Sequence, residues 1–178
     1  NACESLIVHR KIADQFLPLL KKRLSEKNVE VRADEAAMAV VPEFTPAAEE
    51  DWGTEYLDYI LSLKLVDSLD EAIEKVNSMA HPLALYIFTS DKEAAEKVTS
   101  YCGFGGGCVN DTIIHLATSE MGFGGVGESG MGSYHGKDGF HTFSHYKSIV
   151  DKKTWLDLPM RYQPYRKIYE KLLRKFLK

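Results

Sequence analysis

Short apolar runs alternate with helix-type segments along the first 110 residues. The alternation most constrains the fold, because a strand, a helix and a second strand in this order form a right-handed crossover in a parallel sheet. Runs that predict strands cover residues 4–9, 29–31, 59–66, 83–89 and 107–110. The order therefore predicts an α/β fold with three layers, a parallel sheet carrying helices on both of its faces.

Helix signals lie between these runs. Apolar residues at helical spacing predict a helix over Lys11–Glu26, which Pro18 should kink or delay. Ser68 with Glu71, and Ser90 with Glu93, each have the spacing of a capping box at the start of a helix. Thr45-Pro46 followed by acidic residues predicts one more helix start.

The end of the chain does not continue the alternation of predicted strands and helices. His145–Val150 predicts a strand that follows a long loop, and so an edge strand or one that pairs with another chain. We therefore expect one domain over residues 1–150 and a tail over 151–178. From Pro164 the tail has the pattern of an amphipathic helix, with apolar residues at 165, 168, 169, 172, 173, 176 and 177.

The tail is also basic. The segment from Trp155 to Lys178 contains seven basic and two acidic residues, whereas the whole chain of 178 residues has a net charge of −4. That overall charge argues against a nucleic-acid-binding protein. For residues 164–178 we favour packing on the domain or on a partner subunit over contact with an anionic membrane.

The cysteine content indicates the redox state and the compartment expected for the protein. Three cysteines without a C-x-x-C pair favour reduced thiols and a cytoplasmic protein, and no spacing predicts a metal site. No run is long and apolar enough for a membrane span, and no signal peptide is visible. The chain begins at Asn1, which is consistent with a fragment.

Residues 121–137 are rich in glycine. G-x-G-x-x-G occurs twice there, but a dinucleotide loop requires a helix directly afterwards, and glycines at 132, 136 and 139 should prevent one. Asp138 follows Gly136-Lys137 where a phosphate loop needs Ser or Thr. We therefore expect a backbone that turns tightly or approaches another segment closely.

The chain resembles the catalytic domain of the aldehyde dehydrogenase superfamily over nearly its whole length. Residues 1 to about 79 resemble gamma-glutamyl phosphate reductase (glutamate-5-semialdehyde dehydrogenase), through "NACESLIVH" and "EEDWGTEYLDYILSLKLVDSLDEAI". Residues from about 80 to 178 resemble class-three, fatty-aldehyde-type aldehyde dehydrogenases, through "HPLALYIFTSDKE", "GGGCVNDTIIH" and "GFGGVGESGMGSYHGK". The two-branch pattern suggests a chimera joined near residues 77–82.

The resemblance implies a cofactor, NAD or NADP, and a small-molecule substrate, an aldehyde or an acyl phosphate. Phe123 would line the pocket for aldehyde and nicotinamide, and Glu55 would bind the nicotinamide ribose. The alternatives are a core phenylalanine and a solvated acid at a strand end. The resemblance also implies a homodimer formed through residues 145–150.

A nucleophilic thiol is required by the family's reaction. The resemblance places it directly before Asn1, so Cys3 is a doubtful substitute and is better explained as a small buried hydrophobe. Cys102 and Cys108 are expected to be structural, and His135 is the most pocket-like histidine. We expect weak or absent cofactor binding and no activity from this chain alone. The alternative is a non-catalytic engineered chimera, or a folding or assembly module.

Overall fold

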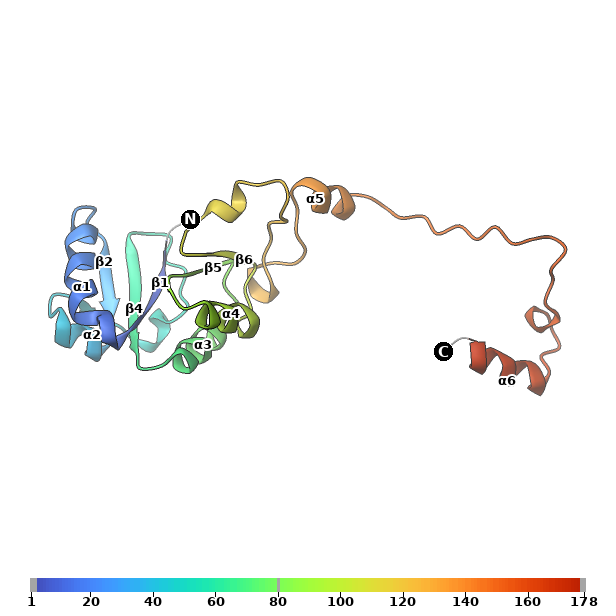
Figure 1. Cartoon of the computed structure of the whole chain (residues 1–178), viewed down its shortest axis with the longest axis horizontal. Helices are drawn as coiled ribbons and strands as arrows, with labels where there is room; N and C mark the ends of the chain where they lie inside the picture. Colours follow the sequence, from blue (N-terminus) through green and yellow to red (C-terminus); the bar gives the residue numbers. More distant parts are fainter. Residues whose placement is uncertain (1–2, 80, 177–178) are drawn as a thin grey trace. The chain divides into compact units, whose positions relative to one another are not determined.

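A computed structural model describes residues 3–79 and 81–176 (Figure 1). Contacts divide the chain into two units, the first ending at Ser144 and the second beginning at His145. The sequence predicts a division at residue 150, and the two boundaries lie six residues apart. We describe each unit by itself.

Parallel strands form the first unit's framework. Strands β1 (Ser5–His9), β4 (Ile60–Val66), β2 (Glu30–Ala33) and β3 (Thr45–Pro46) lie in this order in one sheet. Strands β5 (Ala84–Ile87) and β6 (Gly106–Val109) pair in parallel as a second sheet. The predicted α/β class with parallel strands is confirmed, although the described strands form two sheets and not a single one.

Six α-helices accompany the strands in the described part of the chain: α1 (Arg10–Ser25), α2 (Glu35–Val40), α3 (Leu69–Ser78), α4 (Lys92–Tyr101), α5 (Gly136–Thr142) and α6 (Lys167–Phe176). Short 3₁₀ helices cover Glu49–Asp51, Ile114–Leu116, Gly127–Ser129 and Pro159–Arg161. Helix α1 continues through Pro18, so the proline does not end it.

The main core lies between the first sheet and helices α1 and α2, which stand side by side in Figure 1. Leu17 of α1 and Leu63 of β4 are fully buried there. On β4, Ser62 and Lys64 alternate with the core-facing leucines, as the period of a strand requires. The Lys64 ammonium and that of Lys75 in α3 both lie over the Trp52 ring, at 5.2 and 5.1 Å from its centroid.

The starts of α3 and α4 show how well short sequence patterns predict the residue that caps a helix. Ser68 caps α3 by accepting the Glu71 N–H at 3.1 Å, as predicted, but the Glu71 carboxylate accepts the Asp67 N–H at 2.8 Å, so the reciprocal half of the predicted capping box does not form. Ser90 does not cap α4, and that prediction was wrong. The neighbouring Asp91 carboxylate caps it by accepting the N–H groups of Glu93 and Ala94 at 2.9 and 3.2 Å. One carboxylate oxygen thus serves two of the backbone donors that a helix start leaves unpaired.

A helix predicted to begin at Thr45 is absent among the described residues. Thr45 and Pro46 pair with Arg32 and Ala33 as β3, and the acidic residues that follow form only the short 3₁₀ helix Glu49–Asp51, whereas the α-helix nearest in sequence is the earlier α2. Asp34 starts α2 by accepting the Ala37 N–H at 2.9 Å, while its other oxygen accepts the Leu65 N–H at 3.0 Å. Asp34 thereby joins α2 to β4.

Glycines did not prevent a helix after the glycine-rich segment, contrary to our expectation. Helix α5 includes both Gly136 and Gly139. Gly136 opens it with φ +46°, where glycine has little strain, and Thr142 ties its end to the Ser133 carbonyl at 2.7 Å. A single interior glycine, Gly139, costs about 1 kcal/mol relative to alanine, which does not prevent a helix of two turns here.

The second unit departs from prediction at its start. Residues 145–150 were predicted to form a strand, but they have no regular secondary structure in the described chain. Helix α6 begins at Lys167, three residues after Pro164, and Leu177 and Lys178 of the predicted helix lie outside the described residues. In the part of the chain that the structure describes, none of the helices has the length and apolar character needed to cross a bilayer.

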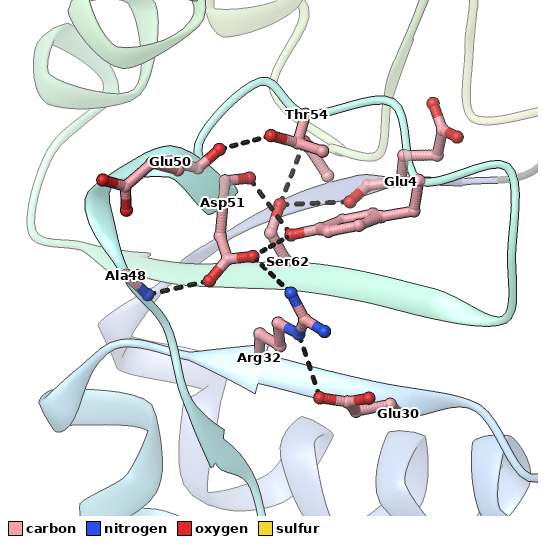
Figure 2. A network of polar contacts seen from close by, with 10 residues as sticks. Glu4, Glu30, Arg32, Ala48, Glu50, Asp51, Thr54 and Ser62 are labelled. Carbon is pink, nitrogen blue, oxygen red and sulfur yellow. Dashed lines mark hydrogen bonds and ion pairs between the residues drawn. The ribbon is translucent and has the colours of Figure 1, made fainter.

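A buried carboxylate fastens the segment before β4 to strand β2 (Figure 2). Asp51 is 6% exposed and accepts hydrogen bonds from Arg32 at 2.9 Å, the Tyr56 hydroxyl at 2.7 Å and the Ala48 N–H at 2.8 Å. Arg32 also donates to Glu30 at 2.9 Å, and its guanidinium lies 5.3 Å from the Tyr56 ring centroid. We call Asp51, Arg32, Tyr56 and Glu30 the Asp51 network.

Protonation in the Asp51 network follows from these contacts. Desolvation raises the pKa of Asp51, but the hydrogen bonds from Tyr56, Ala48 and Arg32 outweigh it, so the pKa is lowered overall. Desolvation and the hydrogen bond to Asp51 raise the pKa of Tyr56 to about 12. Asp51 is therefore ionised and Tyr56 protonated throughout the neutral range, which is the pairing that the geometry requires.

We expect Asp51→Asn to lower the free energy of unfolding at pH 7 by about 2 kcal/mol, because it weakens several hydrogen bonds to one charged group. A depressed pKa in the folded state gives stability above the unfolded pKa of about 4, which is lost as the pH falls further. The difference from the wild type should therefore shrink between about pH 5 and pH 3. The raised pKa of Tyr56 gives stability that is complete below about pH 10 and lost as the pH rises through about 12.

Urea unfolding across this pH range measures the Asp51 effect. Glu43→Gln, at an exposed acid, is the matched control and should change stability little at any pH. A difference between Asp51→Asn and the wild type that stays constant from pH 7 to pH 3 would contradict the role assigned to the ionised carboxylate.

Asp34→Ala should cost about 2 kcal/mol of unfolding free energy, because it leaves the backbone donors of Ala37 and Leu65 without an acceptor. Ser68→Ala removes a cap that serves one donor on exposed α3, and should cost about 1 kcal/mol. Unfolding of the two variants by urea at pH 7 compares them directly. Equal losses would show that the link from Asp34 to β4 contributes nothing.

Candidate functional site

Cys3 precedes strand β1. It has exposed surface, and its thiol donates to the Ser5 carbonyl at 3.6 Å. Desolvation by the protein packed around the sulfur raises the pKa of Cys3, the Glu4 carboxylate raises it further, and the Ser5 contact only partly offsets them. The thiol is therefore protonated near pH 7, which is the wrong state for a nucleophile. Its exposed surface also differs from the buried hydrophobe that we expected.

Glu55 lies in the turn between the 3₁₀ helix Glu49–Asp51 and β4, and it is exposed. The residues beside it are tied down: Thr54 donates to the Glu50 carbonyl, Tyr56 to Asp51, and the Leu57 N–H to the Glu4 carboxylate at 3.3 Å. Among the residues that the structure describes, none makes a hydrogen bond or ion pair with the Glu55 carboxylate. The turn thus holds an available carboxylate on an anchored backbone.

The start of β1 lies beside this turn. The Glu4 carboxylate reaches Leu57, while its carbonyl accepts the Ser62 hydroxyl at 3.0 Å (Figure 2). Strands β1 and β4 run in parallel with Ser5 opposite Ser62, so the two segments approach at the same ends of their strands. The structure therefore places the Glu55 turn beside the segment that carries Cys3.

Phe123 is half-buried within a group of rings. Its N–H and carbonyl pair with those of Tyr134 at 2.7 and 3.0 Å. Its ring lies 6.3 Å from His115, 6.0 Å from Tyr134 and 6.0 Å from His135 between centroids, and it stacks on His135 at 28°. We call Tyr86, His115, Phe123, Tyr134 and His135 the aromatic cluster, since Tyr86 meets His115 at 5.9 Å.

Close backbone contacts account for the glycines around Phe123. A Cβ on Gly124 would overlap the Gly132 carbonyl, and one on Gly125 would overlap the Ser129 carbonyl. A Cβ on Gly122 would meet the Asp138 carboxylate and Ser133. The prediction of a closely approaching backbone is confirmed, and the approach holds Phe123 against Tyr134.

Several residues of the region had no signal in the sequence. Arg32 lies 19 residues from Asp51 in the sequence, and no spacing rule connects it with Asp51 and Tyr56 or marks His115 as a buried residue. His115 is buried, with Nδ1 3.5 Å from the Cys108 sulfur. No recorded contact joins Glu55 to Phe123 among the described residues, and in that same part of the chain no three His, Cys, Asp or Glu side chains gather as metal ligands would.

Proteins similar to this chain are found in both groups that the sequence resembles, the gamma-glutamyl phosphate reductases and the family 3 aldehyde dehydrogenases. Gamma-glutamyl phosphate reductase of Lachnospira eligens is 44% identical over 128 residues, covering 70% of this chain and 30% of that protein. Aldehyde dehydrogenase family 3 member H1 of Arabidopsis thaliana is 33% identical over 183 aligned residues, covering 98% of this chain and 38% of that protein. The chain thus spans well under half the length of these relatives.

A solved structure gives the same result. AldH of Staphylococcus aureus in its substrate-bound state superposes with a TM-score of 0.62 at 36% identity, covering 95% of this chain and 37% of that one. Residues 52–149, more than half of the chain, match the family described as the aldehyde dehydrogenase family. The Glu55 turn and the glycine-rich segment around Phe123 lie within residues 52–149, and the chain belongs to the aldehyde dehydrogenase family.

Proposed function

We propose that the chain forms the pocket-bearing part of the catalytic domain in an NAD- or NADP-dependent oxidoreductase. The observation that carries this is the Glu55 turn, whose backbone is anchored on both sides while its carboxylate has no recorded partner among the described residues. A carboxylate held in this way accepts hydrogen bonds from hydroxyl groups, as a ribose offers. The residues present therefore fit the sugar of a nicotinamide nucleotide.

The nicotinamide supplies hydride transfer when it is bound. Glu55 accepts the ribose hydroxyls and so orients the sugar. Phe123, backed by His135 and Tyr134, presents an apolar face that excludes water from the reacting carbon. The Asp51 network restrains the Glu55 turn through Tyr56, which directly follows Glu55 in the chain.

The substrate class is a carbonyl or acyl compound. One relative is named for an acyl phosphate and another for aldehydes, so oxidation of an aldehyde and reduction of an acyl phosphate are the two reactions in keeping with the proposal. The proposal includes pairing of residues 145–150 with another copy of the chain. A non-catalytic folding or assembly module is the competing function, and it requires no nucleotide binding.

Glu55→Gln should weaken binding of nicotinamide mononucleotide to the chain about tenfold, because an amide replaces a charged acceptor. Titration of ¹⁵N-labelled protein followed by NMR measures it, with the largest shifts expected for the amides of residues 54–58 and 122–124. Glu50→Gln, at an exposed neighbouring acid, should leave the affinity unchanged. Shifts that avoid the Glu55 turn, or equal effects of the two variants, would favour the non-catalytic module.

The chain alone should show no turnover with NAD⁺ or NADP⁺ and short or long aldehydes, because the raised pKa keeps Cys3 protonated. Reduction of the cofactor at 340 nm is a suitable measurement at high protein concentration. Cys3→Ser is the matched variant and should be indistinguishable from the parent. Activity in the parent that disappears in Cys3→Ser would identify Cys3 as the nucleophile and overturn this assignment.

A further inference from the structure

Cys108 and His115, which borders the aromatic cluster, form a close thiol and imidazole pair to which the proposed function gives no role. Cys108 lies on β6 and His115 on the 3₁₀ helix Ile114–Leu116, with 3.5 Å between Sγ and Nδ1. This is hydrogen-bond distance for a thiol, and we assign the tautomer in which Nδ1 accepts from the thiol while Nε2 carries the ring proton. The pair has the separation of a nucleophile and its general base.

His115 is held in place by packing. The residue is 8% exposed, and the Tyr86 ring meets it edge-on. Gly106 lies against its other side, since a Cβ there would come within 3.0 Å of Cδ2 and 3.3 Å of Nε2. The ring therefore has little freedom to turn its Nδ1 away from the thiol.

Burial of this imidazole is costly for the fold. Nε2 is fully buried and has no hydrogen-bond partner within the described structure. A buried polar atom without a hydrogen-bond partner destabilises the fold, and an apolar side chain at this position would avoid that cost. Packing alone therefore does not account for a histidine here, whereas a proton acceptor for Cys108 does.

An open hollow makes the pair accessible. Its volume is about 580 Å³, and both Cys108 and His115 line it. The apolar side chains of Val109, Ile114 and Met121 line it as well, and they are 46%, 59% and 50% exposed. Asp111 and Thr118 add polar groups to the lining. A compound that reaches the sulfur can therefore bury a hydrocarbon chain against the three apolar side chains, which favours it over a small polar compound.

We propose that Cys108 is a nucleophilic thiol, with His115 as its base, that is modified by apolar α,β-unsaturated aldehydes. The thiol proton passes to His115 Nδ1, and the sulfur forms a bond to the β-carbon as the carbon–carbon π bond breaks. The electron pair moves to the α-carbon, which takes the proton back from Nδ1. The product is a saturated thioether aldehyde, and no oxidant or reductant is consumed.

The other two thiols lack this arrangement. Cys102 is buried at 8% exposure, and desolvation raises its pKa. Cys3 is exposed, and the described residues that act on its thiol are Ser5, through its carbonyl, and the acidic Glu4. Selective reaction at Cys108 therefore cannot be explained by exposure, which would favour Cys3. The proposal is independent of the proposed oxidoreductase function.

The experiment treats the intact chain with (E)-2-nonenal or with acrylamide, a small polar acceptor, and locates the adducts by peptide mass spectrometry over time. With nonenal we expect Cys108 to react on the order of tenfold faster than Cys3 at pH 7. With acrylamide this preference should be smaller, because the apolar hollow contributes nothing. Preferential reaction of Cys3 with nonenal would overturn the proposal, and this comparison uses only the wild type.

His115→Gln tests the base. It should slow the reaction of Cys108 about tenfold and move the rise of its rate with pH to more alkaline values, while Cys3 keeps its rate. His141→Gln, at an exposed histidine of α5, is the matched control and should change neither rate. An unchanged rate and pH profile in a folded His115→Gln variant would show that the imidazole does not activate the thiol.

Discussion

The buried carboxylate of Asp51 is the contact on which the candidate site depends. A charge this far from water is stable only when several donors surround it, and Arg32, Tyr56 and the Ala48 N–H meet that requirement. These donors come from β2 and from both sides of the short 3₁₀ helix. The consequence reaches Glu55, because the turn that carries it cannot shift without separating Tyr56 from Asp51.

Local patterns predicted the elements that depend on local causes. The apolar runs became β1, β2, β4, β5 and β6, and Ser68 caps α3, because strand burial and capping involve residues close in sequence. The errors arose where a longer-range contact decided the outcome. Thr45 and Pro46 have the residue pattern of a helix start but pair with β2. Asp34 caps α2 with one carboxylate oxygen and binds β4 with the other. Gly136 and Gly139 are tolerated in α5 once Thr142 anchors it.

The candidate site was predictable only in part, and for a similar reason. Glu55, Phe123 and Cys3 came from resemblance, whereas Arg32 and Asp51 are 19 residues apart and no spacing rule connects them. The predicted junction near residues 77–82 also involves contacts between residues far apart in sequence, which no spacing rule reveals. Asn77 donates to the Tyr101 carbonyl at 2.8 Å and accepts the Gly103 N–H at 3.3 Å, which joins α3 to the end of α4. The chimera stays a prediction, but any join there must preserve these two bonds.

His115 connects the candidate pocket with the thiol of Cys108. The same imidazole contacts Cys108 through Nδ1 and lies 6.3 Å from the Phe123 ring. Phe123 is also paired through its backbone with Tyr134 and stacked on His135. A displacement of His115 would therefore remove one of the contacts of the Phe123 ring while its other contacts remain. An adduct on Cys108 adds volume to the hollow beside His115. Because packed side chains move as groups, chemistry at that sulfur would be transmitted to the ring assigned to the aldehyde pocket.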